Sequence, residues 1–418
     1  MMPEFAVFED SESNVRSYCR SFPAKFEKAA GSKLFDVGGK EWLDFLSGAG
    51  SLNYGHNHPA MRKKLLEYID GGGIVNSLDF YTTAKEEFIR LFKECILVPR
   101  GLDYKMQFCG PTGTNSVEAA VKLAKKVTGR KGVVSFSNSY HGMSAGSMSV
   151  SASFKKRNEE YLNPNWVTFL PFSGFSGLDN EFEFIRTMLT SPGSGIAKPA
   201  AFIVELVQGE GGINVAAPEW VKAICGLAKE LGALVIVDEI QSGCGRTGKF
   251  FSFEHYGIQP DLVCLSKSIS GYGIPMSLLL MKADLDQWDP GEHNGTFRGF
   301  NYGFITGAET LRLFWCGRAF EEDLKDVAGI LGNRLQGFCR TYPGVVAGYR
   351  ALGMFAGLVM NDASTARKVQ EACFDSGLIL ETCGPDGNVV KFLPPINISH
   401  EDLSAGLNLL DRVLARVG

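Results

Sequence analysis

The chain has 418 residues, 45% of them apolar and 11% aromatic, which is enough for large hydrophobic cores in two unequal domains. The formal net charge is −4 and lysine and arginine form no block, which argues against nucleic acid or an anionic membrane as a partner. No apolar run is long enough to span a bilayer, and the first residues do not read as a signal peptide. The ten cysteines are scattered without a Cys-x-x-Cys pair, so we expect them to be reduced in a cytoplasmic protein.

The first elements are a predicted hairpin, a loop and a helix. Residues 33–45 alternate in hydrophobicity around a Gly-Gly pair, which is typical of a β-hairpin. The glycine-rich loop 48–59 carries His56 and His58, but no cysteine or carboxylate stands at metal-ligand spacing, so no metal site is expected. A helix is predicted over 60–69.

A strand, a turn and a helix are predicted between residues 106 and 124. The apolar segment 106–109 runs directly into a Gly/Thr-rich turn, and an Ala- and Val-rich helix follows. Such a junction places N–H groups and hydroxyls at a helix N-terminus, which can bind a phosphate dianion. Thr112, Gly113 and Thr114 are therefore candidate phosphate ligands, although such turns often merely cap a helix.

The next predicted strand, 132–136, leads to Tyr140 and His141. An aromatic side chain at a strand end can stack on a planar ligand, but it often only covers the end of the strand. Residues 151–196 read as a surface excursion that contains one helix, near 181–188.

The chain returns with a buried strand over 200–207, which places Glu205 and Glu210 around its end. Residues 218–230 then form an amphipathic helix that begins with proline. The repeated order of strand, helix and strand predicts an α/β fold with a mainly parallel central sheet and right-handed crossovers.

Two short apolar strands, 233–237 and 262–265, each present one ionisable residue just past the strand end. Asp238 follows the first strand and Lys267 the second. This pair suits pyridoxal phosphate, which needs an amine for its aldehyde and a carboxylate for its ring nitrogen. Judged alone, the pair could equally be a structural ion pair at a sheet edge.

The C-terminal part is predicted to build a smaller α/β domain together with the N-terminal segment. We expect residues 1–70 and 311–418 to form this small domain and residues 71–310 the large one. The expected elements are a helix over 308–340, strands near 352–360, 377–381 and 389–395, and a last helix over 399–417.

Several of these segments resemble the class III (ω-) aminotransferases, which are pyridoxal-phosphate enzymes of fold type I. The resemblance rests on V-D-E-I-Q at 237–241, G-R-T-G at 245–248 and S-K at 266–267. It implies that Lys267 bonds the cofactor and transfers the proton, and that Asp238 pairs with the ring nitrogen.

The resemblance assigns further roles around the cofactor and the substrate. It implies that Gln241 bonds the phenolic oxygen, that Glu205 and Glu210 line the substrate pocket, and that Thr296 reaches the phosphate of a neighbouring subunit. A homodimer with shared active sites, possibly a tetramer, follows from the last of these. The implied cofactor-binding residues are Thr112, Gly113, Thr114, Tyr140, His141, Asp238, Gln241, Lys267 and Thr296.

One departure from the family lies at Lys391, where many relatives have an arginine that binds a substrate carboxylate. Lysine can attract a carboxylate but cannot form the planar bidentate pair. Lys391 is therefore a candidate substrate-binding residue whose geometry differs from that of the relatives, in which the resemblance implies that the arginine pairs with the glutamate matching Glu210.

Within the family, the chain resembles the diaminobutyrate–2-oxoglutarate transaminases of ectoine biosynthesis. This implies L-glutamate as amino donor and L-aspartate 4-semialdehyde as acceptor. The alternatives are a transaminase of the ornithine, lysine or 4-aminobutyrate type, and a non-catalytic pyridoxal-phosphate-binding protein. A dehydrogenase is disfavoured because no Gly-x-Gly-x-x-Gly follows a strand. The segments that carry this resemblance are 15–23, 53–57, 81–85, 99–105, 266–273 and 291–299.

Overall fold

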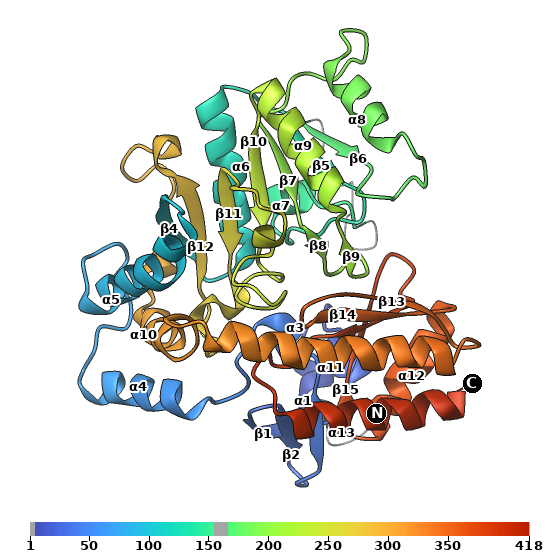
Figure 1. The fold of residues 1–418 in the computed structure, drawn as a ribbon. Coiled ribbons are helices and arrows are strands. Elements are labelled where there is room, and N and C mark those ends of the chain that lie inside the picture. The colour runs from blue at the N-terminus through green and yellow to red at the C-terminus, as the bar shows by residue number, and fades with distance from the viewer. Residues whose placement is uncertain (1–4, 154–165, 418) are drawn as a thin grey trace.

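The computed structural model describes residues 5–153 and 166–417, which fold around a central seven-stranded sheet (Figure 1). The strand order is β4-β12-β11-β10-β7-β5-β6. Neighbours from β11 to β6 are parallel, whereas β12 runs antiparallel to both β11 and β4. The mainly parallel α/β fold predicted from the sequence is confirmed. The strands are β4 (Tyr104–Gly110), β5 (Val133–Phe136), β6 (Val167–Leu170), β7 (Ala201–Val204), β10 (Leu234–Asp238), β11 (Leu262–Leu265) and β12 (Ser277–Lys282).

Helices cover both faces of this sheet, which explains why its central strands are apolar at almost every position. Ile236 of β10 packs in the same core as helix α6 (Gly113–Thr128), whereas Val235 and Val237 pack in the core of helix α9 (Pro218–Leu231). Successive side chains of one strand therefore enter different cores. Both helices connect parallel strands, and all of these strands end at one edge of the sheet.

Two four-stranded sheets lie below the central sheet in Figure 1. The first joins the predicted N-terminal hairpin to the C-terminal part of the chain, because β3 pairs in parallel with β15. The second is antiparallel and belongs wholly to the C-terminal part. The domain boundaries at residues 70 and 310 stay a proposal. The strands are β1 (Phe26–Ala30), β2 (Lys33–Asp36), β3 (Glu41–Asp44) and β15 (Leu378–Ile379), and β13 (Val346–Leu352), β14 (Phe355–Met360), β17 (Val389–Phe392) and β16 (Glu381–Cys383).

The remaining helices surround these sheets. No helix in the described part of the chain is long and apolar enough to cross a membrane. The remaining helices are α1 (Ala6–Ser11), α2 (Tyr18–Ser21), α3 (Ser47–Gly50), α4 (Pro59–Asp70), α5 (Thr83–Leu91), α7 (Ala145–Ser149), α8 (Glu181–Thr190), α10 (Asn301–Thr310), α11 (Ala319–Thr341), α12 (Ala363–Asp375) and α13 (His400–Val417).

Several predicted elements differ from the structure. The strand expected near 377–381 is divided between β15 and β16, which belong to different sheets. The strand expected over 200–207 ends at Val204, and the short strand β8 (Val207–Gln208) then pairs with β9 (Asn214–Val215) instead of the central sheet. The helix expected over 308–340 is interrupted, because α10 passes through a π-helical turn and α11 begins only at Ala319. The excursion 151–196 contains the edge strand β6, and its residues 154–165 lie outside the described part of the chain.

The prediction that all ten cysteines are reduced is wrong for two of them. Cys95 and Cys316 form a disulfide, with Cα atoms 4.7 Å apart although 221 positions separate them in the chain. Cys95 lies in one π-helical segment, Phe92–Leu97, and Cys316 directly follows another, Leu311–Trp315. The two segments pack against each other, and this contact could not be read from the spacing of the cysteines.

Candidate active site

Ten of the predicted site residues line one cavity of about 360 Å³. They come from the segments that follow β4, β5, β7, β10 and β11, whose carboxyl ends meet at one edge of the sheet. Ligands bind at this edge in open α/β sheets. The ten residues are Thr112, Gly113, Thr114, Tyr140, His141, Glu205, Glu210, Asp238, Gln241 and Lys267.

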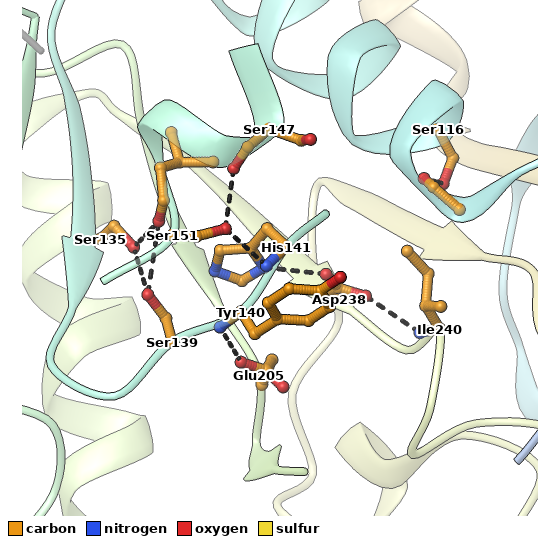
Figure 2. A network of polar contacts seen from close by, with 12 residues as sticks. Ser116, Ser135, Ser139, Tyr140, His141, Ser147, Ser151, Glu205, Asp238 and Ile240 are labelled. Atoms are coloured by element: carbon orange, nitrogen blue, oxygen red, sulfur yellow. Dashed lines mark hydrogen bonds and ion pairs between the residues drawn. The ribbon is translucent and has the colours of Figure 1, made fainter. Parts of the chain in front are cut away.

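Asp238 ends strand β10, and its carboxylate is held from two sides (Figure 2). Oδ2 lies 2.8 Å from Nδ1 of the fully buried His141 ring, and Oδ1 accepts a hydrogen bond of 3.0 Å from the Ile240 N–H. The His141 backbone N–H donates to Ser151 Oγ at 2.8 Å, which fixes the histidine in turn. The Asp238 carboxylate, with 4% of its side-chain surface exposed, therefore has a fixed orientation in the cavity wall.

Lys267 lies at the start of a 3₁₀ turn, with its backbone in the left-handed region (φ 47°). Such a conformation is unfavourable for a lysine and is found where the surroundings enforce it. Here Ser268 Oγ donates to the Gly50 carbonyl at 2.8 Å, and Lys267 Nζ donates to the Ala49 carbonyl at 2.7 Å. Burial lowers the pKa of the Lys267 ammonium to about 8, so part of the amine is uncharged near neutral pH.

Helix α6 begins at Gly113, beside the carboxylate and the amine in the same cavity. Asn115 Oδ1 accepts hydrogen bonds from the N–H and the hydroxyl of Thr112, at 3.1 and 2.8 Å. Asn115 thus stabilises the start of the helix. A Cβ at Gly113 would lie 2.9 Å from Ile240 Cδ1, so a larger residue there would have to displace the Ile240 side chain. The N–H groups of a helical first turn have no partner within the helix and attract anions.

Glu205 and Gln241 complete the wall of the cavity. Glu205 Oε1 accepts the Tyr140 N–H at 2.8 Å, which fixes the backbone beneath the Tyr140 ring. Burial raises the pKa of the Glu205 carboxyl to about 7. Gln241 Nε2 donates to the Ala49 carbonyl at 3.0 Å, so the same oxygen accepts from both Gln241 and Lys267.

Lys391 does not line this cavity, but it contacts a residue that does. Its Nζ, with the side chain fully buried, lies 2.8 Å from Glu210 Oε1 and 2.8 Å from Glu381 Oε1. Glu381 was missed in the sequence. It follows the apolar run 378–380, the same signal that singled out Asp238, and β16 pairs it with Lys391.

Thr296 is exposed and begins a 3₁₀ turn, Thr296–Gly299, outside the cavity of its own chain. Its predicted contact with the phosphate in a second subunit stays a prediction. Of the two loop histidines, His56 contacts Asp44 Oδ2 through Nε2 at 2.7 Å.

Comparison with known proteins decides the family. The model of the family described as aminotransferase class-III matches residues 16–414. The chain belongs to the class-III aminotransferases. This class-III chain is 50% identical to a diaminobutyrate–2-oxoglutarate transaminase of Streptomyces anulatus over 411 residues, which cover 98% of the chain and 97% of the relative. It is 47% identical to a protein of the same name from Vibrio parahaemolyticus, with 98% and 97% covered.

Solved structures agree with this assignment. The chain superposes on the ornithine aminotransferase of Toxoplasma gondii with a TM-score of 0.84, at 26% identity over 99% of the chain and 94% of that structure. An S-selective transaminase from an Arthrobacter species shares the fold, with a TM-score of 0.85 at 22% identity over 99% of the chain and 97% of that structure. The chain therefore shares its fold with solved transaminases along nearly its whole length.

Proposed function

We propose that the protein is a pyridoxal-phosphate-dependent transaminase that moves an amino group between L-glutamate and L-aspartate 4-semialdehyde, giving 2-oxoglutarate and L-2,4-diaminobutyrate. One observation carries the chemistry: a buried carboxylate, Asp238, and a buried amine of lowered pKa, Lys267, line one cavity beside a helix N-terminus. The choice of substrate rests on relatives that are 46–50% identical along nearly the whole chain and carry the name of this reaction.

The residues of the cavity fit the cofactor in three independent ways. The protonated ring nitrogen of the cofactor needs a carboxylate beside it, and Asp238 is a carboxylate held by His141. An aldehyde needs an amine, and Lys267 supplies one. A phosphate dianion needs N–H donors, and α6 begins at Gly113. When bound, pyridoxal phosphate supplies the aldehyde that takes up the amino group and a ring that withdraws electrons from the substrate carbon.

The chain's own residues then provide proton transfer and orientation. Lys267 would accept the proton of the substrate carbon when its amine is uncharged and deliver it to the aldehyde carbon of the cofactor, since its pKa of about 8 allows both forms near neutral pH. Asp238 keeps a proton on the ring nitrogen, and His141 fixes the direction of that carboxylate. Tyr140 presents a ring to the same cavity, where it can stack on the flat ring of the cofactor. Gln241, which lines the same cavity, would hydrogen-bond the phenolic oxygen of the cofactor.

The proposal includes a cytoplasmic homodimer whose active sites are shared. Thr296, exposed in the single chain, would then complete the phosphate site of the second subunit. Exposed apolar side chains next to Thr296 and between residues 74 and 81 support such an interface. They are Ile74, Val75, Leu78, Phe80, Tyr81 and Phe297.

A substrate panel tests the function. The purified protein is incubated with 2-oxoglutarate and, separately, with 2,4-diaminobutyrate, ornithine, lysine or 4-aminobutyrate, and glutamate formation is measured. We expect the largest kcat/KM with diaminobutyrate. The similarity to an ornithine aminotransferase makes ornithine the second candidate. Absence of turnover with diaminobutyrate would refute the substrate assignment, and an absorbance spectrum that glutamate leaves unchanged would refute transamination.

A further inference from the structure

A second cavity, of about 480 Å³, adjoins the active-site cavity, and Glu210 lines both. Glu381 and Tyr18 also line the second cavity. A substrate whose reacting amine lies near Lys267 can therefore extend past Glu210 toward Glu381. The charges of Glu210, Lys391 and Glu381 all act on the Lys267 amine, which places this group close to the reacting centre.

Lys391 lies between two carboxylates, although one would suffice to neutralise it. Strand β17 places Lys391 opposite Glu381 of β16, and Glu210 approaches from the segment after β8. Burial alone would lower the pKa of the Lys391 ammonium, but Glu210 and Glu381 raise it well above its usual value, so the amine stays charged. The group of three thus carries a formal charge of −1, which favours a cationic group of a ligand over an anionic one.

Glu381 has hydrogen-bonding capacity that the described residues leave unused. Its Oε2 accepts from the Tyr18 hydroxyl at 3.3 Å. Its Oε1 is buried and is ion-paired with Lys391 Nζ at 2.8 Å. A carboxylate offers about four acceptor sites, so these two contacts leave part of its capacity unused. Because 8% of the Glu381 surface is exposed, this carboxylate is an almost fully buried acceptor beside the substrate cavity. A buried carboxylate with free capacity favours a charged N–H donor.

We propose that Glu381 binds the α-ammonium group of a diamino acid whose distal amine reacts at Lys267. This inference rests on the proposed function and names the substrate class of that site as α,ω-diamino carboxylates. Glutamate and 4-aminobutyrate lack a second ammonium group. Glu381 therefore distinguishes the diamino acid from both of these amines.

The variant Glu381→Gln keeps the shape of the side chain and removes its charge. In the holoenzyme, the ratio of kcat/KM for diaminobutyrate to kcat/KM for glutamate should fall about 10- to 100-fold, because a hydrogen bond to a charged group is lost. The loss should reside in KM and in the dissociation constant from spectral titration, since Glu381 does not contact the reacting atoms. Glu381→Asp should keep part of the preference.

Asp386→Asn is the matched control. Asp386 lines the same cavity, but it is exposed, so its removal changes the charge of the cavity without removing the proposed contact. The ratio should stay within threefold of the wild-type value. An equal fall in both variants would overturn the proposal, because the effect would then be one of overall charge. An unchanged ratio in Glu381→Gln would overturn it as well.

A second measurement uses the unaltered protein and does not depend on how the variant folds. Nα-acetyl-2,4-diaminobutyrate keeps the carboxylate and the reacting amine but has no α-ammonium group. We expect its kcat/KM to be at least about tenfold below that of diaminobutyrate. Equal values would refute the role of Glu381 while leaving the proposed function intact. If the wild-type protein turns over no diaminobutyrate, the proposed function itself fails.

Discussion

Replacement of Lys391 by methionine tests how the three charged groups beside the active site stabilise the fold. Lys391 is fully buried, and it is placed between Glu210 and Glu381 by strand pairing in the C-terminal antiparallel sheet. Methionine has a similar length and no charge. The variant therefore leaves two carboxylates facing each other without the ammonium group between them.

The contact distances give the size of the effect. Both carboxylate oxygens lie 2.8 Å from Lys391 Nζ, so they are separated by at most twice that distance. Two unit charges so placed repel by about 3 kcal/mol at an effective dielectric constant of about 20. Removal of one partner from a buried ion pair costs about 3–5 kcal/mol. Because 22% of the Glu210 side chain is exposed, we expect Lys391→Met to lower the free energy of unfolding by about 3 kcal/mol.

Urea unfolding at pH 7 and fixed protein concentration measures this loss. Lys391→Arg, which keeps the charge, is the control and should lose less. Adding Glu381→Gln to Lys391→Met should recover about 1–3 kcal/mol, because one of the two repelling charges disappears. The reasoning would be refuted if Lys391→Met unfolded within 1 kcal/mol of the wild type, or if the double variant were less stable than the single one.

Three further predictions concern the amine, the carboxylate and the disulfide. The pKa of Lys267 is about 8 in the folded protein and about 10.5 in the unfolded chain, so the folded form loses this proton first as the pH rises. The unfolding free energy of the cofactor-free protein should therefore increase between about pH 8 and pH 10.5, by no more than about 3 kcal/mol relative to the Lys267→Met variant. If the unfolding free energies of the two proteins changed in parallel with pH, this prediction would be contradicted. Asp238→Asn should lower kcat about 10²- to 10³-fold with the cofactor still bound, and a loss below threefold would show that this carboxylate does not act on the ring. Cys316→Ser, which opens the bond to Cys95, should lower the unfolding free energy by about 2–4 kcal/mol without added reductant, whereas equal stabilities would show that the thiols are not linked.

The central sheet and the position of the site were predictable because their signals are local. A short β-branched run that ends in an acidic residue predicts a buried strand with a carboxylate at its end, and β10 and Asp238 have this form. Lys267 after β11 follows the same rule. Parallel strands end at one edge of the sheet, so residues 29 positions apart meet in one cavity.

The contacts that escaped prediction join distant segments whose approach has no local pattern. Glu381 meets Lys391 only because β16 and β17 pair in one particular register. The carbonyl of Ala49, which accepts from Lys267, lies in the short segment α3, whose four residues all have a left-handed backbone. The disulfide depends on the packing of two π-helical segments, and π-helical turns have no sequence signal of the kind used here.

The central claim is that Lys267 and Asp238 contact opposite ends of one cofactor. Reduction of the purified holoenzyme with borohydride, followed by peptide mass spectrometry, tests it most directly. We expect a phosphopyridoxyl group on the peptide that contains Lys267, and no such group on any other lysine. A modification at a different lysine, or a protein that carries none after incubation with pyridoxal phosphate, would contradict it.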